Sequence, residues 1–395
     1  MRKTIGFASI RTIPFSGKET KQPVVIDFKR FNFLKTHFPK TSRKDWKSWQ
    51  WQIQNSISDL EKLEEIIKLN TREKAELQQL NVKLPLRITP YYANLIANLG
   101  SDHPLRKTVI PSTNELKMSF GEATGPLHEE DDKKVPGLVH RYPDRVLVLL
   151  TDFCATNCRY CTRSRLVGLE RTVCNFEKVL DYIKEHKEIR DVLLSGGDPL
   201  TLSDAKLEYY LQKIRAIGHV EMIRIGTKVP VVLPQRITTQ LVNMLKKYHP
   251  LYISIHFTHP AELTTETQNA CRMLADAGIP LGSQTVLLKN VNDSADTLKK
   301  LFHELLKVRV KPYYLYQCDP ISGSAHFRTT VHKGIQIMEK LRGYTSGYAI
   351  PTYVIDAPGG GGKIPVQSKY LIDENADYIF LKNYEKKIFA YPKLK

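Results

Sequence analysis

The feature that most constrains the fold is an alternation of short apolar, β-rich runs with amphipathic stretches, which begins at Val146 and continues through six repeats. Parallel neighbours in a sheet need a crossover connection, and right-handed helical crossovers dominate. The alternation therefore predicts an α/β fold, a partial (β/α)6 barrel of six parallel strands. The predicted strands are Val146–Leu150, Asp191–Leu194, Met222–Gly226, Leu251–Phe257, Leu281–Leu288 and Tyr313–Gln317.

The sequence before the alternation has a different character. Ser56–Leu80 is a charged helical pattern, and it is preceded by all three tryptophans of the chain, Trp46, Trp49 and Trp51. We expect the tryptophans to pack rather than to form a ligand cage. The predicted regions are a mainly helical N-terminal region (1–140), the barrel (141–345) and a C-terminal extension (346–395).

Three closely spaced cysteines, Cys154, Cys158 and Cys161, follow the first predicted strand. A four-iron cubane cluster normally takes four thiolates, so three with no fourth nearby predict a cluster with one open coordination position. Zinc is the main alternative, but the chain shows neither a second C-x2-C pair nor an H-x3-H pair to close a tetrahedron, so we do not expect it. Inert core thiols are the third interpretation.

Net charge and segment composition limit the partners and the compartment. Lys and Arg number 59 against 41 Asp and Glu, a formal charge of +18, and such an excess attracts nucleic acid or other anions. The charges are interleaved and no nucleic-acid-binding module is recognisable, so a basic iron–sulfur protein that binds nucleic acid is only the alternative from a different class. The sequence holds no apolar run of membrane-spanning length, and Met1–Phe7 does not resemble a signal peptide, which predicts the cytoplasm and no membrane.

A glycine pair follows the second predicted strand. Gly196 and Gly197 let the backbone approach a ligand closely, and Asp198 could accept a hydrogen bond from an ammonium group; an ordinary turn is the alternative. Sites in α/β barrels lie at the carboxyl ends of the strands, so this motif and the cysteines share one rim.

A second glycine-rich motif, Asp356-Ala357-Pro358-Gly359-Gly360-Gly361-Gly362-Lys363, lies near the end of the chain. Ordering four consecutive glycines on folding is entropically unfavourable, so their presence suggests that this backbone has a specific use. Such a loop can turn N–H groups toward a phosphate, while Lys363 can pair with the phosphate or attack a carbonyl. The spacing is not that of a P-loop. Pyridoxal phosphate, which needs an amine and phosphate donors, is one interpretation, and a flexible surface turn is the other.

Together these motifs resemble radical S-adenosylmethionine enzymes and, among them, the pyridoxal phosphate-dependent lysine 2,3-aminomutase family. The likeness runs from about Leu84 to Tyr391. It implies an isomerase whose [4Fe-4S] cluster binds S-adenosylmethionine and generates a 5′-deoxyadenosyl radical. The amino group of L-lysine then moves from C2 to C3, while it is bound to pyridoxal phosphate as an external aldimine, and the product is β-lysine. The further matching segments are Thr162–Arg165, Leu194–Asp198, Tyr316–Asp319 and Asp356–Lys363.

The resemblance also implies residue roles. A pair of carboxylates around one cation is physically reasonable, because each charge-assisted hydrogen bond contributes roughly 1.5–3 kcal/mol. The pair favours a cationic side chain, so arginine or another cationic amino acid is the alternative substrate. The implied roles are Cys154, Cys158 and Cys161 for the cluster; Lys363 for the imine with pyridoxal phosphate; Arg141 and Arg145 for its phosphate; Gly196, Gly197, Asp198 and Gln284 for S-adenosylmethionine; Arg163 for the substrate carboxylate; and Asp319 and Asp356 for the distal ammonium.

The chain departs from the family pattern in one respect. Bacterial fermentative members carry C-terminal cysteines that help to bind zinc between subunits, but the segment 382–395 has no cysteine and Ser294 stands at the partner position. The resemblance therefore predicts no zinc here. We still expect a homo-oligomer, and an unidentified electron donor as a partner.

Overall fold

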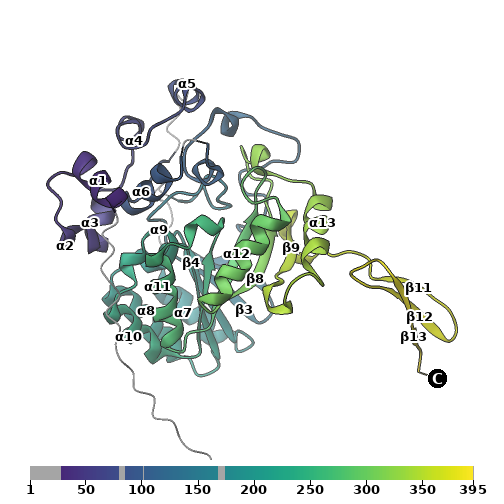
Figure 1. Ribbon diagram of the computed structural model, residues 1–395. Helices are drawn as coiled ribbons and strands as arrows, with labels where there is room; N and C mark the ends of the chain where they lie inside the picture. Colours follow the sequence, from purple (N-terminus) through teal and green to yellow (C-terminus); the bar gives the residue numbers. More distant parts are fainter. Residues whose placement is uncertain (1–27, 80–84, 101, 168–173, 395) are drawn as a thin grey trace, which may run out of the picture. The chain divides into compact units, whose positions relative to one another are not determined.

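The computed structural model describes residues 28–79, 85–100, 102–167 and 174–394 (Figure 1). The chain forms two compact units, Met1–Pro39 and Lys40–Lys395. The described part of the first unit holds helix α1, Phe28–His37. The segment Met1–Phe7, which entered the prediction of the compartment, lies outside the described residues, as do Leu80 and Leu84.

The second unit is built on a ten-stranded sheet in the order β1 to β10. Strands β3 to β9 are parallel to their neighbours, while β1, β2 and β10 add antiparallel edges. The six predicted strands are all present, and the α/β barrel-type fold is confirmed. They are β3 (Arg145–Thr151), β4 (Asp191–Gly196), β5 (Met222–Thr227), β6 (Leu251–His256), β7 (Leu281–Leu287) and β8 (Val310–Gln317).

The sheet continues beyond the sixth predicted strand. Strand β9 (Thr352–Ala357) pairs in parallel with β8, and β10 (Gly362–Pro365) folds back on β9 as a hairpin. Pairing of β9 carries the glycine-rich motif to the carboxyl ends of the parallel strands. Antiparallel strands β1 (Lys133–Val135) and β2 (Leu138–Tyr142) extend the other edge.

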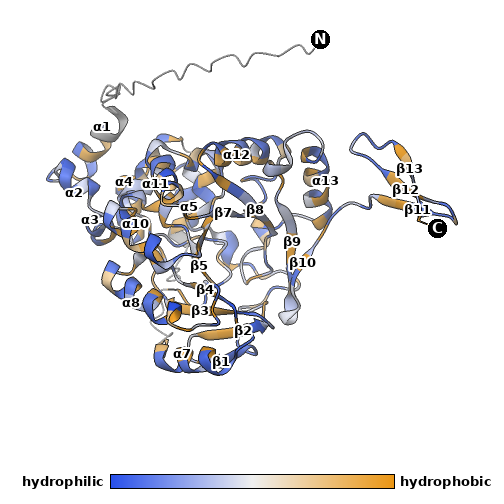
Figure 2. Cartoon of the chain, turned by 90° about the horizontal axis from the view of Figure 1, so that it is seen from below, coloured by the Kyte–Doolittle hydropathy of each residue, from blue (hydrophilic) through white to orange (hydrophobic). Residues whose placement is uncertain are grey.

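Helices connect the parallel strands and lie outside the arc of the sheet (Figure 2). Apart from the four-residue α9 (Val229–Val232), each begins at a Ser, Thr or Asn whose side chain accepts a backbone N–H, the standard N-terminal cap. Ser294 is the cap of α12, and Leu298, Leu301, Phe302 and Leu305 form the buried stripe of that helix. The helices are α7 (Phe176–Glu185), α8 (Asp204–Arg215), α10 (Thr239–Leu245), α11 (Thr265–Asp276), α12 (Ala295–Lys307) and α13 (Val331–Leu341).

The predicted helical N-terminal region is also confirmed, and its residues beyond 39 pack on the barrel. Trp46 is buried, and Gln52 joins two segments by donating to the Trp46 carbonyl and accepting from the backbone of Tyr91. Thr89 donates to the carbonyl of Val232 in the barrel. The helices are α2 (Arg43–Lys47), α3 (Trp49–Gln54), α4 (Leu60–Ile66), α5 (Thr71–Gln79) and α6 (Pro90–Asn98).

A small antiparallel sheet follows the barrel, made of β11 (Leu371–Glu374), β12 (Tyr378–Lys382) and β13 (Ile388–Pro392). All of β13 is exposed, including Ile388, Phe389 and Tyr391. Among the described helices, none has the length and hydropathy to cross a membrane.

Candidate active site

Two cavities adjoin at the carboxyl ends of the parallel strands. The first is lined by the three cysteines and the glycine pair, and the second by Lys363, the two aspartates and the arginines. Both cavities include Arg163, Ser195 and His256 in their walls. The predicted site residues are therefore brought together in one continuous region, as expected for a barrel of parallel strands.

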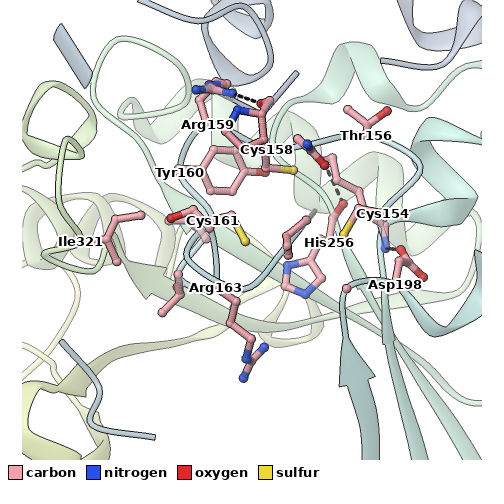
Figure 3. A pocket seen from close by; sticks show the side chains of 18 of the residues that line it. Cys154, Thr156, Cys158, Arg159, Tyr160, Cys161, Arg163, Asp198, His256 and Ile321 are labelled. Carbon is pink, nitrogen blue, oxygen red and sulfur yellow. Dashed lines mark hydrogen bonds between the residues drawn. The ribbon is translucent and has the colours of Figure 1, made fainter. Parts of the chain in front are cut away.

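The cysteine loop is held by backbone hydrogen bonds to the N-terminal region. The backbone N–H groups of Asn157 and Arg159 donate to the carbonyls of Arg87 and Thr108, both at 2.9 Å. The Arg159 guanidinium also forms an ion pair with Glu115. Figure 3 shows that the sulfur atoms of the triad, Cys154, Cys158 and Cys161, face a common space.

These cysteines suit an iron–sulfur cluster. Burial raises the pKa of all three thiols, and mutual repulsion acts in the same direction on Cys154 and Cys161; together these effects raise the pKa of Cys161 to about 11. Three thiolates at this place therefore need positive charge beside them, and iron ions would supply it. Within the described ranges, no group of three His, Cys, Asp or Glu is arranged to hold a single metal ion, whereas a cubane takes each thiolate on a different iron.

The glycine pair is required by the close approach of the cysteine loop. Gly196 has φ +111°, and a Cβ there would lie well under 3.0 Å from the carbonyl oxygen of Thr151. A Cβ on Gly197 would collide in the same way with the backbone of Phe153. The sequence predicts that these glycines allow close approach of a ligand. In the structure their close contacts are with the chain itself, although both also line the first cavity.

Asp198 is buried and holds strand ends together. Both of its carboxylate oxygens accept internal hydrogen bonds, and burial raises its pKa. Its predicted contact with the amine of S-adenosylmethionine stays a prediction. The donors are Leu200 N, Thr227 Oγ1, Lys228 N and Val229 N.

Lys363 lies on β10 opposite Asp356 of β9, and its Nζ is 3.0 Å from Asp356 Oδ2. Its backbone N–H donates to the hydroxyl of Tyr142 at 2.9 Å, and the rings of Tyr142 and Tyr316 lie 5.9 and 5.8 Å from Nζ. The four-glycine segment is therefore the turn of a hairpin that presents Lys363 to the second cavity. Gly362 has positive φ there and abuts Tyr142.

The two aspartates share the second cavity with Lys363. Asp319 accepts a hydrogen bond from Thr162 Oγ1 at 2.6 Å, and burial together with the charge of Asp356 raises its pKa to about 6. Asp356 Oδ1 is buried and has no hydrogen-bond partner in the described part of the chain. An unsatisfied buried carboxylate oxygen favours a ligand with a hydrogen-bond donor.

Arg163 lies on the wall between the cavities and is held by a residue that sequence reasoning missed. Its Nη2 and Nε donate to Glu129 at 2.6 and 3.3 Å, and Arg165 lies 3.7 Å from the same carboxylate. Burial alone would raise the pKa of Glu129, but Arg163 and Arg165 outweigh it and lower the value. Glu129 belongs to an acidic run, 129–132, in which nothing in the local pattern separates it from solvated surface charges, so the sequence carries no signal for this contact.

Arg141 and Arg145 line the second cavity beside Tyr142. Arg141 donates from Nε to Asp132 at 2.6 Å and from Nη2 to the Leu127 carbonyl. Arg145 stacks on Tyr142, with its guanidinium carbon 4.1 Å from the ring centroid. Arg141 and Arg145, together with the amine of Lys363 in the same cavity, fit a phosphate-bearing aldehyde such as pyridoxal phosphate.

Two further residues lie near the wall between the cavities. Gln284 donates to Tyr316 Oη at 3.3 Å and lines the second cavity, so its predicted contact with S-adenosylmethionine stays a prediction. His256, which sequence reasoning missed, lines both cavities. Burial, with the positive charges of Lys228 and Arg163, lowers its pKa to about 4, so His256 is neutral at pH 7.

Comparisons with known proteins agree with this geometry. Residues 148–302 match the family described as Radical SAM superfamily, and residues 338–395 match the family described as Lysine-2,3-aminomutase. An L-lysine 2,3-aminomutase from Fusobacterium nucleatum is 51% identical over 364 residues, 91% of this chain and 85% of the relative. The chain belongs to the lysine 2,3-aminomutase family. Membership of the radical SAM superfamily implies a [4Fe-4S] cluster, S-adenosylmethionine, a small-molecule substrate and an electron donor.

Relatives within this aminomutase family differ in the amino acid that they are named for. An L-lysine 2,3-aminomutase from Clostridium subterminale is 51% identical over 357 residues, 90% of this chain and 86% of the relative. A glutamate 2,3-aminomutase from Clostridioides difficile is 43% identical over 350 residues, 88% of this chain and 83% of the relative. The substrate of this aminomutase must therefore be argued from the residues of the second cavity.

Proposed function

We propose that this aminomutase moves the amino group of L-lysine from C2 to C3 and releases β-lysine. The observation that carries the proposal is the pair of carboxylates, Asp319 and Asp356, in the cavity of Lys363 and next to the cavity of the cysteine triad. A C2-to-C3 transfer needs a radical generator and an amine-binding site side by side, and the two adjoining cavities suit that need.

The charges of the second cavity favour lysine over glutamate. Glutamate would place a third carboxylate near Asp319 and Asp356, and like charges in a buried site repel strongly. Asp356 already accepts a hydrogen bond from the ammonium of Lys363 at 3.0 Å, so it is suited to an ammonium group. Arg163, facing the same cavity, is the proposed partner of the substrate carboxylate, because a guanidinium suits planar carboxylates.

We further propose that pyridoxal phosphate occupies the second cavity, with Lys363 as its amine and Arg141 and Arg145 at its phosphate. The aromatic walls formed by Tyr142 and Tyr316 support this fit. When bound, pyridoxal phosphate supplies an aldehyde for the migrating nitrogen and a conjugated ring that delocalises an unpaired electron. The triad would hold the [4Fe-4S] cluster, which with S-adenosylmethionine supplies the radical that takes hydrogen from C3.

In this proposal the residues of the chain bind and orient the substrate. Asp319 and Asp356 fix the distal ammonium and Arg163 fixes the carboxylate, so the carbon chain between them is held in one orientation. His256 is neutral and adds no charge at the wall between the cavities. Gly196, Gly197 and Asp198 shape the first cavity for S-adenosylmethionine, and Gln284 orients Tyr316.

We also propose a homo-oligomer in a reducing compartment, the cytoplasm. The exposed apolar side chains of β13, including Ile388, Phe389 and Tyr391, support a contact between subunits, because apolar patches of this kind often mark interfaces. The thiols of the triad support a reducing compartment, where they would stay available to iron.

The test is anaerobic turnover. Protein reconstituted with iron, sulfide and pyridoxal phosphate is incubated with L-lysine, S-adenosylmethionine and dithionite, and products are identified by mass spectrometry. We expect β-lysine, and none when S-adenosylmethionine is omitted. L-Arginine and L-glutamate are tested in parallel. Protein that holds both cofactors and yet forms no β-lysine would contradict the proposal, and turnover of arginine alone would redirect it to that substrate.

A further inference from the structure

Each cysteine of the triad has a cation near it, supplied by a different element. The positive charges of Arg87, Lys228 and Arg163 oppose the burial that raises the pKa of Cys154, Cys158 and Cys161, respectively. Arg163 faces both cavities, and Arg87 stacks on Phe153. Lys228 differs from these two arginines because it has no evident role in binding or in packing an aromatic ring.

Lys228 directly follows β5 and lines the first cavity, yet only 9% of its side chain is exposed. Its Nζ has three hydrogen-bond acceptors: Glu262 Oε1 at 2.8 Å, the His256 carbonyl at 3.2 Å and Thr258 Oγ1 at 3.3 Å. An ammonium group has three N–H donors, and all three are used here. Lys228 therefore acts on the cavity through its charge rather than by donating to a ligand.

Glu262 holds the lysine in place and is itself completely buried. It also accepts hydrogen bonds from the Tyr92 hydroxyl at 2.8 Å and from the backbone N–H of His259 at 3.1 Å. Burying an ion pair carries a desolvation penalty of several kcal/mol per ion, and apolar replacements of buried pairs are often equally stable. Stability alone is therefore a weak reason for a lysine and a glutamate at this place.

We propose that Lys228, positioned by Glu262, raises the reduction potential of the cluster held by Cys154, Cys158 and Cys161. An external one-electron donor adds one negative charge to the cluster before S-adenosylmethionine is cleaved, and a nearby buried ammonium stabilises that charge. Cluster potentials depend on net charge, hydrogen bonds and solvent exposure, and a charge acts more strongly in a buried site than in water. The inference rests on the proposed assignment of the triad as cluster ligands.

Other charged groups near the first cavity also affect the reduction potential of the cluster, each in a direction set by its charge. Glu262 opposes Lys228 because its negative charge disfavours reduction, and buried Asp198 acts in the same direction. Arg163 assists Lys228, whereas His256 is neutral and contributes little. Removal of Lys228 and removal of the charge of Glu262 should therefore shift the potential in opposite directions.

The experiment is a redox titration of the reconstituted cluster followed by electron paramagnetic resonance. For Lys228→Met we expect a more negative midpoint: at a fixed potential the ratio of reduced to oxidised cluster falls about tenfold, equivalent to about 59 mV for one electron. Glu262→Gln should move the midpoint in the positive direction, and Lys228→Arg should stay close to the unaltered protein. Lys184→Met is the matched control, because Lys184 is paired with Asp181 at 3.1 Å but is 55% exposed on α7.

An unchanged or more positive midpoint in Lys228→Met, with iron and sulfide content retained, would overturn the inference. If Lys228→Met fails to hold a cluster, the test is the midpoint potential of Glu262→Gln. An unchanged or more negative midpoint in Glu262→Gln would also overturn the inference. The readout needs no turnover of lysine. A cluster that titrates as expected in protein that forms no β-lysine would therefore contradict the proposed function and leave this inference standing.

Discussion

The cavity of the cysteine triad and the cavity of Lys363 keep their shapes by different means. In the first, one loop is pinned by backbone hydrogen bonds, as at Asn157, and packs against glycines such as Gly197 that leave no room for a side chain. Ion pairs such as Arg159–Glu115 also contribute there. In the second, the polar side chains that line the cavity are themselves held in ion pairs. These pairs are Lys363–Asp356, Arg163–Glu129 and Arg141–Asp132.

The difference indicates two kinds of preorganisation. Backbone contacts fix the cysteine cavity whether or not a ligand is bound, so changes there should affect how much cofactor is held. Ion pairs in the Lys363 cavity occupy groups that a charged ligand could share or replace, so changes there should affect affinity. Variants in each cavity can test this distinction.

The largest expected effect separates the two cofactors. Cys161→Ala should lose the cluster and keep pyridoxal phosphate, and Lys363→Ala should do the reverse, because each side chain belongs to one cavity. Each variant should lower the rate of β-lysine formation at least about a thousandfold, as removal of an essential catalytic group commonly does. Iron and sulfide assays and the visible absorbance of bound pyridoxal phosphate measure the separation. Loss of both cofactors in either variant would show that the cavities are not independent.

The sequence predicted the cysteine cavity better than the Lys363 cavity, for a physical reason. The triad and the glycine pair are short motifs, and a strand in front of each places them on one rim of a parallel sheet. Lys363 was also recognised from a local motif. The position of Lys363 and Asp356 at the second cavity, however, depends on β9 joining the sheet beside β8, and the sequence pattern predicts only six barrel strands.

The residues that sequence reasoning missed are partners rather than motif members. Glu129, Asp132 and Glu262 each make an ion pair with a residue at least nine positions away, and nothing in the local pattern separates them from solvated charges. His256 ends an apolar strand and gains its position only from the sheet. Long-range pairing is decided by packing, so the spacing of residues in the sequence carries no information about it.

The next effect concerns substrate affinity in the ion-paired cavity. Asp319→Asn keeps an oxygen that can accept from Thr162 but removes the charge offered to the distal ammonium. Loss of one charge-assisted hydrogen bond of about 1.5–3 kcal/mol predicts a rise in KM for L-lysine of roughly 10- to 150-fold. Asp181→Asn, at an exposed position, is the control. A KM unchanged in Asp319→Asn would remove this carboxylate from substrate binding.

A smaller effect tests whether backbone contacts fix the cysteine loop. Gly197→Ala forces a Cβ against the Phe153 backbone, and overpacking of this kind destabilises by about 1–3 kcal/mol. Gly218→Ala is the matched control, because nothing lies within 4 Å of a Cβ there and φ is not positive. Thermal unfolding and iron content after reconstitution are the measurements. Equal unfolding temperatures for the two variants would mean that the cysteine loop yields easily and is not fixed by its backbone.

The smallest effect is a pH dependence that belongs to the Lys363 cavity alone. Burial and the charge of Asp356 raise the pKa of Asp319 to about 6, so this carboxyl becomes protonated and neutral as the pH falls through that value. Because only the ionised form attracts an ammonium group, KM for L-lysine should rise severalfold between pH 7 and pH 5.5. The ammonium groups of lysine stay charged over this range, so the inflection belongs to the protein.

Two observations distinguish this titration from a general loss of structure at low pH. The inflection should be absent from Asp319→Asn, whose amide does not titrate, although its KM is higher throughout. Iron content and the spectrum of the cluster should not change across the same range, because no part of the expected effect arises in the cysteine cavity. An inflection that persists in Asp319→Asn would assign it to another group, and one accompanied by loss of iron would mean that the two cavities respond to pH together.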